Sequence, residues 1–214
     1  MTMLGIHPDA ITHHADHVED SDLHAVGGAL TNLSALHRAG ALTHYHVMAV
    51  KDWTTTHYRD VNDHLRNGTP AGAWVRGTIK HLDHMIASNP IPHGVHVYRG
   101  VHGPLAEPLK SVKAGDVLSN RGFTSTSLSP HRVTHFAKGE HMMHIELPQG
   151  SHAMYVSHPD INTNHTMERE LVLPRSAKLR YLGNRQVTIP EHHYDGTPTG
   201  AVRRLTMHHM RYEE

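Results

Sequence analysis

The hydrophobic residues of this chain change their period near residue 90, and this change restricts the fold more than any other feature. From Ser21, the segment SDLHAVGGALTNLSALHRAG begins with a capping serine, carries apolar residues at roughly helical spacing and stops at Gly40. Residues 42–65 repeat apolar side chains every three or four positions, and residues 71–87 give a third helical pattern that ends at Ser-Asn-Pro. The first half of the chain is therefore predicted to be helical.

The second half contains short apolar and β-branched segments separated by Gly, Pro and Asn, which is the pattern of strands. The predicted strands are GVHVYRGV, GFTSTSL, HMMHIELP, ELVLP, AKLRYL and AVRRLTMHHM. Helices followed by strands predict an α+β fold, with a helical N-terminal layer packed on a two-sheet β-sandwich core. We expect residues 1–20 to form a flexible histidine-rich arm and residues 21–214 a single domain, divided into a helical part (21–90) and a β-sandwich part (91–214).

Charge and cysteine content exclude several classes of function. Lys plus Arg and Asp plus Glu both number 20, so no basic excess recruits a polyanion or a membrane surface. The chain has no cysteine, which excludes disulfides, thiol catalysis and thiolate metal sites. Neither a signal peptide nor an apolar segment long enough for a bilayer is recognisable, and this predicts a soluble, cytoplasmic protein.

Histidine is unusually frequent, with 26 copies. Close pairs invite a metal-binding interpretation, but the HExxH motif is absent and no carboxylate recurs at a fixed offset from the pairs. We therefore predict that no metal is required, and a non-catalytic histidine-rich metal-binding or structural protein remains an alternative. Stability is expected to change between neutral and mildly acidic pH, because an unperturbed imidazole titrates at about pH 6.5.

Three polar clusters lie in predicted strands where apolar residues would be expected. Arg99 ends an apolar strand, residues 125–127 (Ser-Thr-Ser) fill the middle of another, and Glu168 and Glu170 open a third. In an extended chain these two glutamates point to the same face, so they are predicted to require a cationic or electron-poor partner. Each cluster taken singly also fits an ordinary solvent-exposed strand.

Taken together and in this order, VYRG, GFTSTSLSP and MERELVLP resemble the motifs of the mono-ADP-ribosyltransferases of the Arg-Ser-Glu class. This family includes clostridial actin-modifying toxins and enzymes of tailed phages. The intervals of 26 positions from Arg99 to Ser125 and 45 from Ser125 to Glu170 are of the size that the family shows. The upstream segment AVKDWTTTHYRDVNDHLRNG resembles the family's helix before the Arg strand, with Tyr58 and Asn62 in its pattern. The resemblance covers residues 43 to 212 and implies a sandwich core of ADP-ribosyltransferase type.

The resemblance implies that NAD is the co-substrate and assigns roles around it. Glu170 would stabilise the positive charge that grows on the ribose as nicotinamide leaves, and Ser125 would hydrogen-bond and orient Glu170. Arg99 would anchor the diphosphate, and Gly100 would let the backbone approach the nicotinamide amide. Thr126 belongs to the same predicted NAD-binding set.

Phe136 is a further candidate, because related toxins carry an aromatic ring near this position that packs on nicotinamide; a core phenylalanine is the alternative. Lys138 could meet a phosphate. Glu168 would accept the guanidinium of an incoming arginine, since family members with Glu at this position tend to modify arginine. The expected reaction is transfer of ADP-ribose to an arginine of a host or target protein, and the likeness to phage enzymes favours the cytoplasm of a host bacterium. A nucleic-acid acceptor and an NAD glycohydrolase that uses water are alternatives.

Overall fold

The computed structural model describes residues 42–136, 140–156, 168–193 and 197–214. The predicted arm over residues 1–20 and the predicted helix from Ser21 to Gly40 lie outside these ranges. Of the helices in the described ranges, none combines the length and the apolar character that a bilayer crossing requires.

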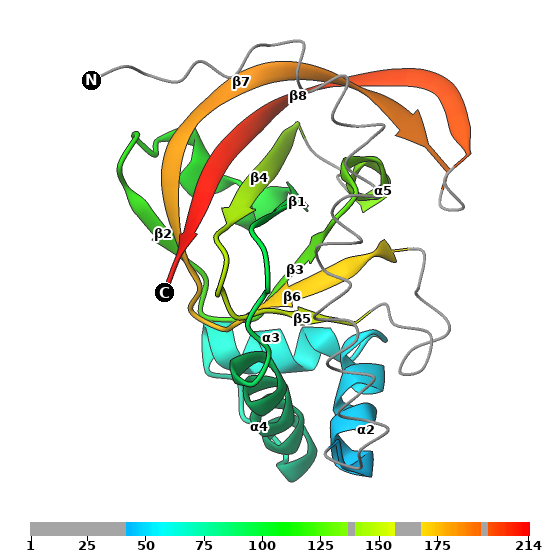
Figure 1. Ribbon diagram of the computed structural model, residues 1–214, viewed down its shortest axis with the longest axis vertical. Helices are drawn as coiled ribbons and strands as arrows, with labels where there is room; N and C mark the ends of the chain where they lie inside the picture. Colours follow the sequence, from blue (N-terminus) through cyan, green and yellow to red (C-terminus); the bar gives the residue numbers. More distant parts are fainter. Residues whose placement is uncertain (1–41, 137–139, 157–167, 194–196) are drawn as a thin grey trace.

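A helical layer precedes the strands, as the sequence predicts. It consists of α2 (His44–Trp53), α3 (Tyr58–Asn67) and α4 (Ala73–Ala87), shown below the sheet in Figure 1. The single helix predicted for residues 42–65 is divided in two. Thr54 Oγ1 donates to the carbonyl of Val50 at 3.1 Å and Thr55 Oγ1 donates to that of Asp52 at 2.8 Å. Threonine hydroxyls that bond to preceding carbonyls compete with the helical pattern, so the Thr-Thr-Thr segment ends α2.

All six predicted strands are present, and two short ones were not predicted. In chain order the strands are β1 (Val95–Val101), β2 (Val117–Ser119), β3 (Thr124–Ser127), β4 (His141–Leu147), β5 (Met154–Tyr155), β6 (Glu170–Leu173), β7 (Lys178–His192) and β8 (Pro198–Glu213). Helix α5 (Pro130–Phe136) and the 3-10 turns η1 (Gly103–Leu105) and η2 (Glu107–Lys110) complete the described elements. The unpredicted strands β2 and β5 have three and two residues, too few for a periodic pattern.

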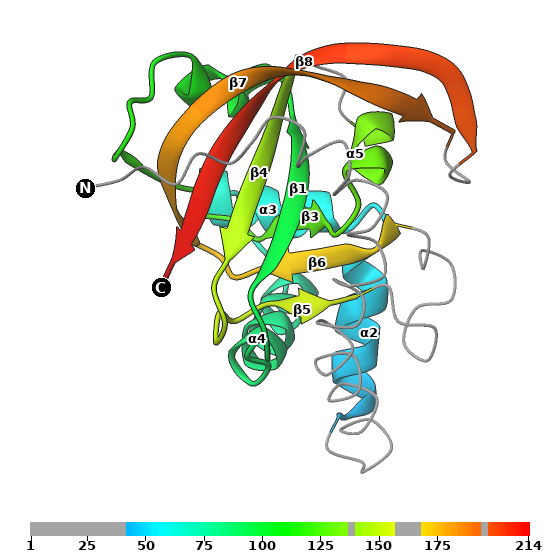
Figure 2. The ribbon, with the colours of Figure 1, turned by 45° about the horizontal axis from the view of Figure 1, so that its top comes forward.

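The strands form one hydrogen-bonded sheet in the order β2-β7-β8-β4-β1-β3-β6-β5. The structure differs here from the predicted pair of sheets, because the pairing of Tyr98 with Ser127 joins β1 to β3 and so connects the two halves. Strand β8 runs parallel to β4, and β7 and β8 form a long hairpin that arches over the molecule (Figures 1 and 2).

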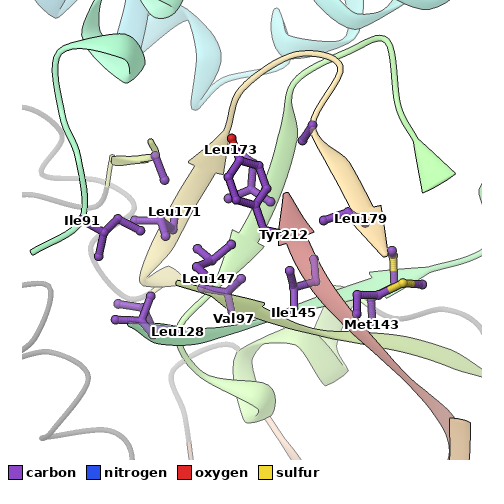
Figure 3. Close-up of a cluster of buried hydrophobic side chains, with 14 of the residues drawn as sticks. Ile91, Val97, Leu128, Met143, Ile145, Leu147, Leu171, Leu173, Leu179 and Tyr212 are labelled. Carbon is purple, nitrogen blue, oxygen red and sulfur yellow. The ribbon is translucent and has the colours of Figure 1, made fainter. Parts of the chain in front are cut away.

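Two apolar clusters explain the layers. In the first, Leu171 and Leu173 of β6 meet residues of the other half of the sheet, among them Val97, Ile145 and Leu147 (Figure 3). The second joins the helices to the opposite face of β6, where Val172 contacts a cluster with residues of α2 and α4. Alternate residues of β6 therefore serve different cores, and the buried strand reads as continuously apolar in the sequence.

A row of histidine rings crosses strands β1, β4 and β8. We name it the histidine ladder (His96, His144 and His209): His96 Nδ1 lies 3.0 Å from His144 Nε2, and His144 Nδ1 lies 3.1 Å from His209 Nδ1. Each contact needs one nitrogen with a hydrogen and one without, which favours neutral imidazoles. Burial, followed by the charges of His96 and His209, lowers the pKa of His144 to about 3. Nearby, burial and the charge of His141 lower the pKa of His208 to about 4.

The protein is expected to lose stability as the pH falls from about 6.5 to about 4. An unfolded histidine binds a proton near pH 6.5, whereas folded His144 and His208 stay neutral until about pH 3 and 4. In this window the unfolded state binds more protons, so each of these groups lowers the free energy of unfolding by up to about 1.4 kcal/mol per pH unit. Thermal unfolding measured across this range should give a falling Tm, and H144N should flatten the profile. The exposed His102 provides the control H102N, and an unchanged slope in H144N would contradict the assignment.

Candidate active site

The junction of β1 and β3 brings together two of the predicted site residues. Strand β1 pairs with β4 along its length and meets β3 only where Tyr98 lies opposite Ser127. Next to this pair, Arg99 Nη1 donates to the carbonyl oxygen of Ser125 at 2.6 Å. Arg99 and Ser125, 26 positions apart in the chain, are thus direct neighbours in the fold.

The charges around Arg99 identify three further groups at this junction. Burial of the guanidinium, followed by the charge of Arg66 on α3, lowers the pKa of Arg99 to about 10. Glu170 and Tyr58 act in the opposite direction and raise it. Arg66 is itself desolvated, which lowers its pKa, and its Nε donates to Asn120 Oδ1 at 3.0 Å. Two neighbouring guanidiniums repel one another, so the junction is electrostatically suited to an anion with at least two charges.

Glu170 is the first residue of β6 and only 8% of its surface is exposed. Its Cα partner in β3 is Ser127, and Ser125 lies opposite Val172. Because alternate residues share a face, Ser125, Ser127 and Glu170 lie on the same side of the sheet. Trp53 Nε1 at the end of α2 donates to Glu170 Oε1 at 3.1 Å.

The expected hydrogen bond from the Ser125 hydroxyl to Glu170 does not occur among the described residues. The ladder register accounts for this difference, since the residue directly opposite Glu170 is Ser127, two positions along the strand from Ser125. A resemblance between motifs gives the order of the residues but not the register of two strands 45 positions apart. An orienting role for Ser125 stays a prediction.

The hydroxyls of Thr126 and Ser127 hold the backbone of the glutamate segment. Thr126 Oγ1 donates to the carbonyl of Leu171 at 2.6 Å, and Ser127 Oγ donates to that of Glu168 at 2.8 Å. Thr126 points to the face opposite Glu170 and is 4% exposed. The structure therefore does not bring the Thr126 side chain to the side of the sheet that carries Glu170, and its predicted contact with NAD is not supported by this position.

The segment before Glu170 corrects the expectation that Glu168 and Glu170 extend side by side from one strand. Strand β6 begins at Glu170, and Arg169 has a φ of 49°, in the left-handed region. A non-glycine residue in this region carries strain, on the order of 1 to 3 kcal/mol, which surrounding contacts must offset. Leu128 N donates to the Arg169 carbonyl at 3.1 Å and Val156 N donates to the Glu170 carbonyl at 3.0 Å. The direction of the Glu168 side chain is therefore set by the backbone turn at Arg169, and not by the alternation of side chains along a strand.

Helix α3 lines the same junction. Tyr58 and Arg66, whose charges act on Arg99, and Asn62 between them are four residues apart and so share one face of the helix. Asn62 is buried, and its Oδ1 has no hydrogen-bond partner within the described ranges. A Cβ at Gly122 would lie 2.2 Å from this oxygen, so the loop before β3 can approach Asn62 only because residue 122 is glycine.

Comparison with known proteins decides the family. Residues 31–197 match the profile of the family described as ADP-ribosyltransferase exoenzyme. The chain belongs to this family. An ADP-ribosyltransferase exoenzyme uses NAD as its co-substrate, and a comparison with curated proteins found no match.

Solved structures of ADP-ribosyltransferase toxins share the fold. Plx2a from Paenibacillus larvae superposes with a TM-score of 0.67 at 18% identity, covering 94% of this chain and 96% of the toxin. The enzymatic component C2-I of the Clostridium botulinum C2 toxin gives 0.65 at 15% identity, with 89% of this chain and 47% of C2-I covered. Exoenzyme S from Pseudomonas aeruginosa, solved with human 14-3-3 protein beta and carba-NAD, gives 0.61 at 19% identity over 92% of this chain and 88% of that one.

The side chains of this ADP-ribosyltransferase fit NAD. The neighbouring guanidiniums of Arg66 and Arg99 match the two negative phosphates of a dinucleotide, and arginine presents paired donors to phosphate oxygens. Glu170 supplies the negative group beside them. Within the described ranges, no three His, Asp or Glu side chains converge as a set of metal ligands.

Sequence reasoning missed two residues that the structure places at the site. Arg66 and Trp53 both lie in the segment AVKDWTTTHYRDVNDHLRNG, which was interpreted only as a family-like helix. Gly100 follows Arg99 on β1 and lies opposite Met142, and its approach to the nicotinamide amide stays a prediction. Phe136 ends α5, but its side chain lies outside the described residues, as does Lys138.

Proposed function

We propose that this enzyme transfers ADP-ribose from NAD to an arginine of a target protein and releases nicotinamide, and that it is a member of the Arg-Ser-Glu class. The convergence of Arg99, Ser125 and Glu170 at the junction of β1, β3 and β6 carries this proposal. Arg99 bonds to the Ser125 backbone, and Glu170 lies close enough to raise the pKa of Arg99. The three motifs, which are far apart in the sequence, therefore meet at one place in the fold.

Each of these side chains has a task that its chemistry suits. Arg99, with Arg66 beside it, binds and orients the diphosphate through paired donors. Glu170 lies where the ribose gains positive charge as the bond to nicotinamide breaks, so it stabilises the transition state more than the ground state. Its burial strengthens this effect, because water screens a charge less at a site that is 8% exposed.

The choice of arginine as acceptor rests on Glu168. A second carboxylate two residues from Glu170 can accept the guanidinium of a substrate arginine and take its proton as it attacks. The Arg169 backbone turn separates Glu168 from the strand that holds Glu170. This separation supports a division of labour in which Glu170 serves the sugar and Glu168 serves the acceptor.

The test is incubation of the purified protein with labelled NAD and a bacterial lysate, followed by mass spectrometry of the proteins that acquire label. The proposal expects nicotinamide release together with ADP-ribose attached to arginine side chains. Label found only in free ADP-ribose would identify an NAD glycohydrolase instead, and label on nucleic acid or on other side chains would refute the arginine assignment.

A further inference from the structure

The hydrogen bond between Trp53 and Glu170 joins residues 117 positions apart in the chain. The indole Nε1 donates to Oε1 at 3.1 Å, and the two residues are 1% and 8% exposed. We propose that Trp53 is a positioning residue for Glu170: its N–H fixes one carboxylate oxygen and favours the ionised group, the task that was predicted for Ser125. The inference rests on the proposed function, because it concerns how the carboxylate that serves the ribose is aimed.

Two aromatic rings pack against the indole ring of Trp53. Phe123 packs edge-on against it with ring centroids 5.5 Å apart, and Tyr58 does so at 6.1 Å. Phe123 is fully buried and directly precedes β3, the strand that pairs with β6. The donor and its acceptor are therefore anchored to the same pair of strands, and edge-to-face packing restricts rotation of the ring.

The chemistry of the contact is directional. An indole N–H donates and cannot accept, so its hydrogen bond is strongest when the acceptor carries a negative charge. A hydrogen bond to the charged form of a carboxyl favours that form, and the buried setting strengthens the interaction. Trp53 thus contributes both the direction of Glu170 and its ionised state, the two properties that stabilisation of a cationic sugar requires.

W53F removes the donor and keeps an aromatic ring. We expect kcat for nicotinamide release to fall about tenfold while KM for NAD changes less than about twofold, because a hydrogen bond to a charged group is lost away from the diphosphate contacts. The acidic limb of the pH–rate profile should move to higher pH, since the carboxylate becomes easier to protonate. A drop in Tm with unchanged kcat and pH profile would reduce Trp53 to a packing residue.

The chain offers a matched control in its only other tryptophan. Trp74 also donates its Nε1 to a carboxylate, Asp52 Oδ2 at 2.8 Å, but it is 42% exposed. W74F is expected to keep the kcat, KM and pH profile of the unchanged protein. A tenfold loss in W74F equal to that in W53F would show that any tryptophan replacement has this effect and would overturn the proposal.

A spectroscopic measurement decides the matter even if W53F does not fold. In W74F, Trp53 is the sole indole, and its fluorescence should change as Glu170 takes up a proton, whereas W74F/E170Q should lack this transition. Identical titrations of the two proteins would refute the contact. The fluorescence titration does not depend on turnover. Absence of nicotinamide release in the unchanged protein would therefore count against the proposed function alone.

Discussion

E170Q is expected to lower NAD hydrolysis and ADP-ribose transfer together, each by about a thousandfold. The amide keeps the shape of the side chain and an oxygen that can still accept from Trp53, but it removes the negative charge. Both reactions require the bond between nicotinamide and ribose to break, so both lose the same stabilisation of the cationic sugar. Nicotinamide release and incorporation of labelled ADP-ribose measure the two reactions separately.

Binding of NAD should survive in E170Q, because Arg99 and Arg66 remain to hold the diphosphate. The control is E107Q, which makes the same chemical change at an exposed glutamate that pairs with Lys110 at 2.7 Å. Its turnover should equal that of the unchanged protein. Near-normal nicotinamide release in E170Q would remove the mechanism, whatever the affinity for NAD.

E168Q is expected to separate the two reactions. Transfer to arginine should fall about a hundredfold, because a general base of this kind contributes a factor of that order, while NAD hydrolysis stays within about threefold. Hydrolysis persists because water needs no guanidinium acceptor and Glu170 is intact. The ratio of labelled protein to released nicotinamide is the quantity to measure.

The contrary outcome for E168Q is an equal loss of both activities, which would mean that Glu168 supports Glu170 and does not serve the acceptor. A folded protein with unchanged Tm must be established first, since Ser127 Oγ holds the Glu168 carbonyl at 2.8 Å. That contact involves the backbone, so exchange of the side chain leaves it in place. E107Q again serves as the control for replacing a carboxylate with an amide.

The sequence predicted the elements that have a period of their own. Helix α4 and strands such as β1 and β4 carry enough alternating or helical repeats to be recognised locally. The division between α2 and α3 was not predicted, because it arises from hydroxyls that bond to backbone carbonyls within an otherwise helical pattern. The union of the two halves of the sheet depends on one residue pair, Tyr98 and Ser127, which no periodicity encodes.

The candidate site likewise contains contacts that the sequence predicted and contacts that it did not. Motif order predicted that Arg99 and Ser125 would meet, and they do, through the carbonyl of Ser125. The sequence pointed to the Ser125 hydroxyl as the group that orients Glu170, and it did not predict the hydrogen bond that Trp53 of the helical layer donates to Glu170 Oε1. This contact joins groups 117 positions apart and depends on the packing of a helix on a sheet, so no local sequence pattern indicates it. The left-handed backbone of Arg169 also has no signal in the sequence, because arginine is not a residue type that indicates a positive φ.

The position of β8 has a consequence for how the chain is made. This strand is formed by residues 198–213, after every other described strand, yet it lies in the interior of the sheet between β7 and β4. While a ribosome is still adding these residues, the edge of β4 stays open and the nascent chain exposes a template for unwanted association. The sheet can therefore close between β4 and β7 only after residues 198–213 have been synthesised, and the described fold is incomplete until then.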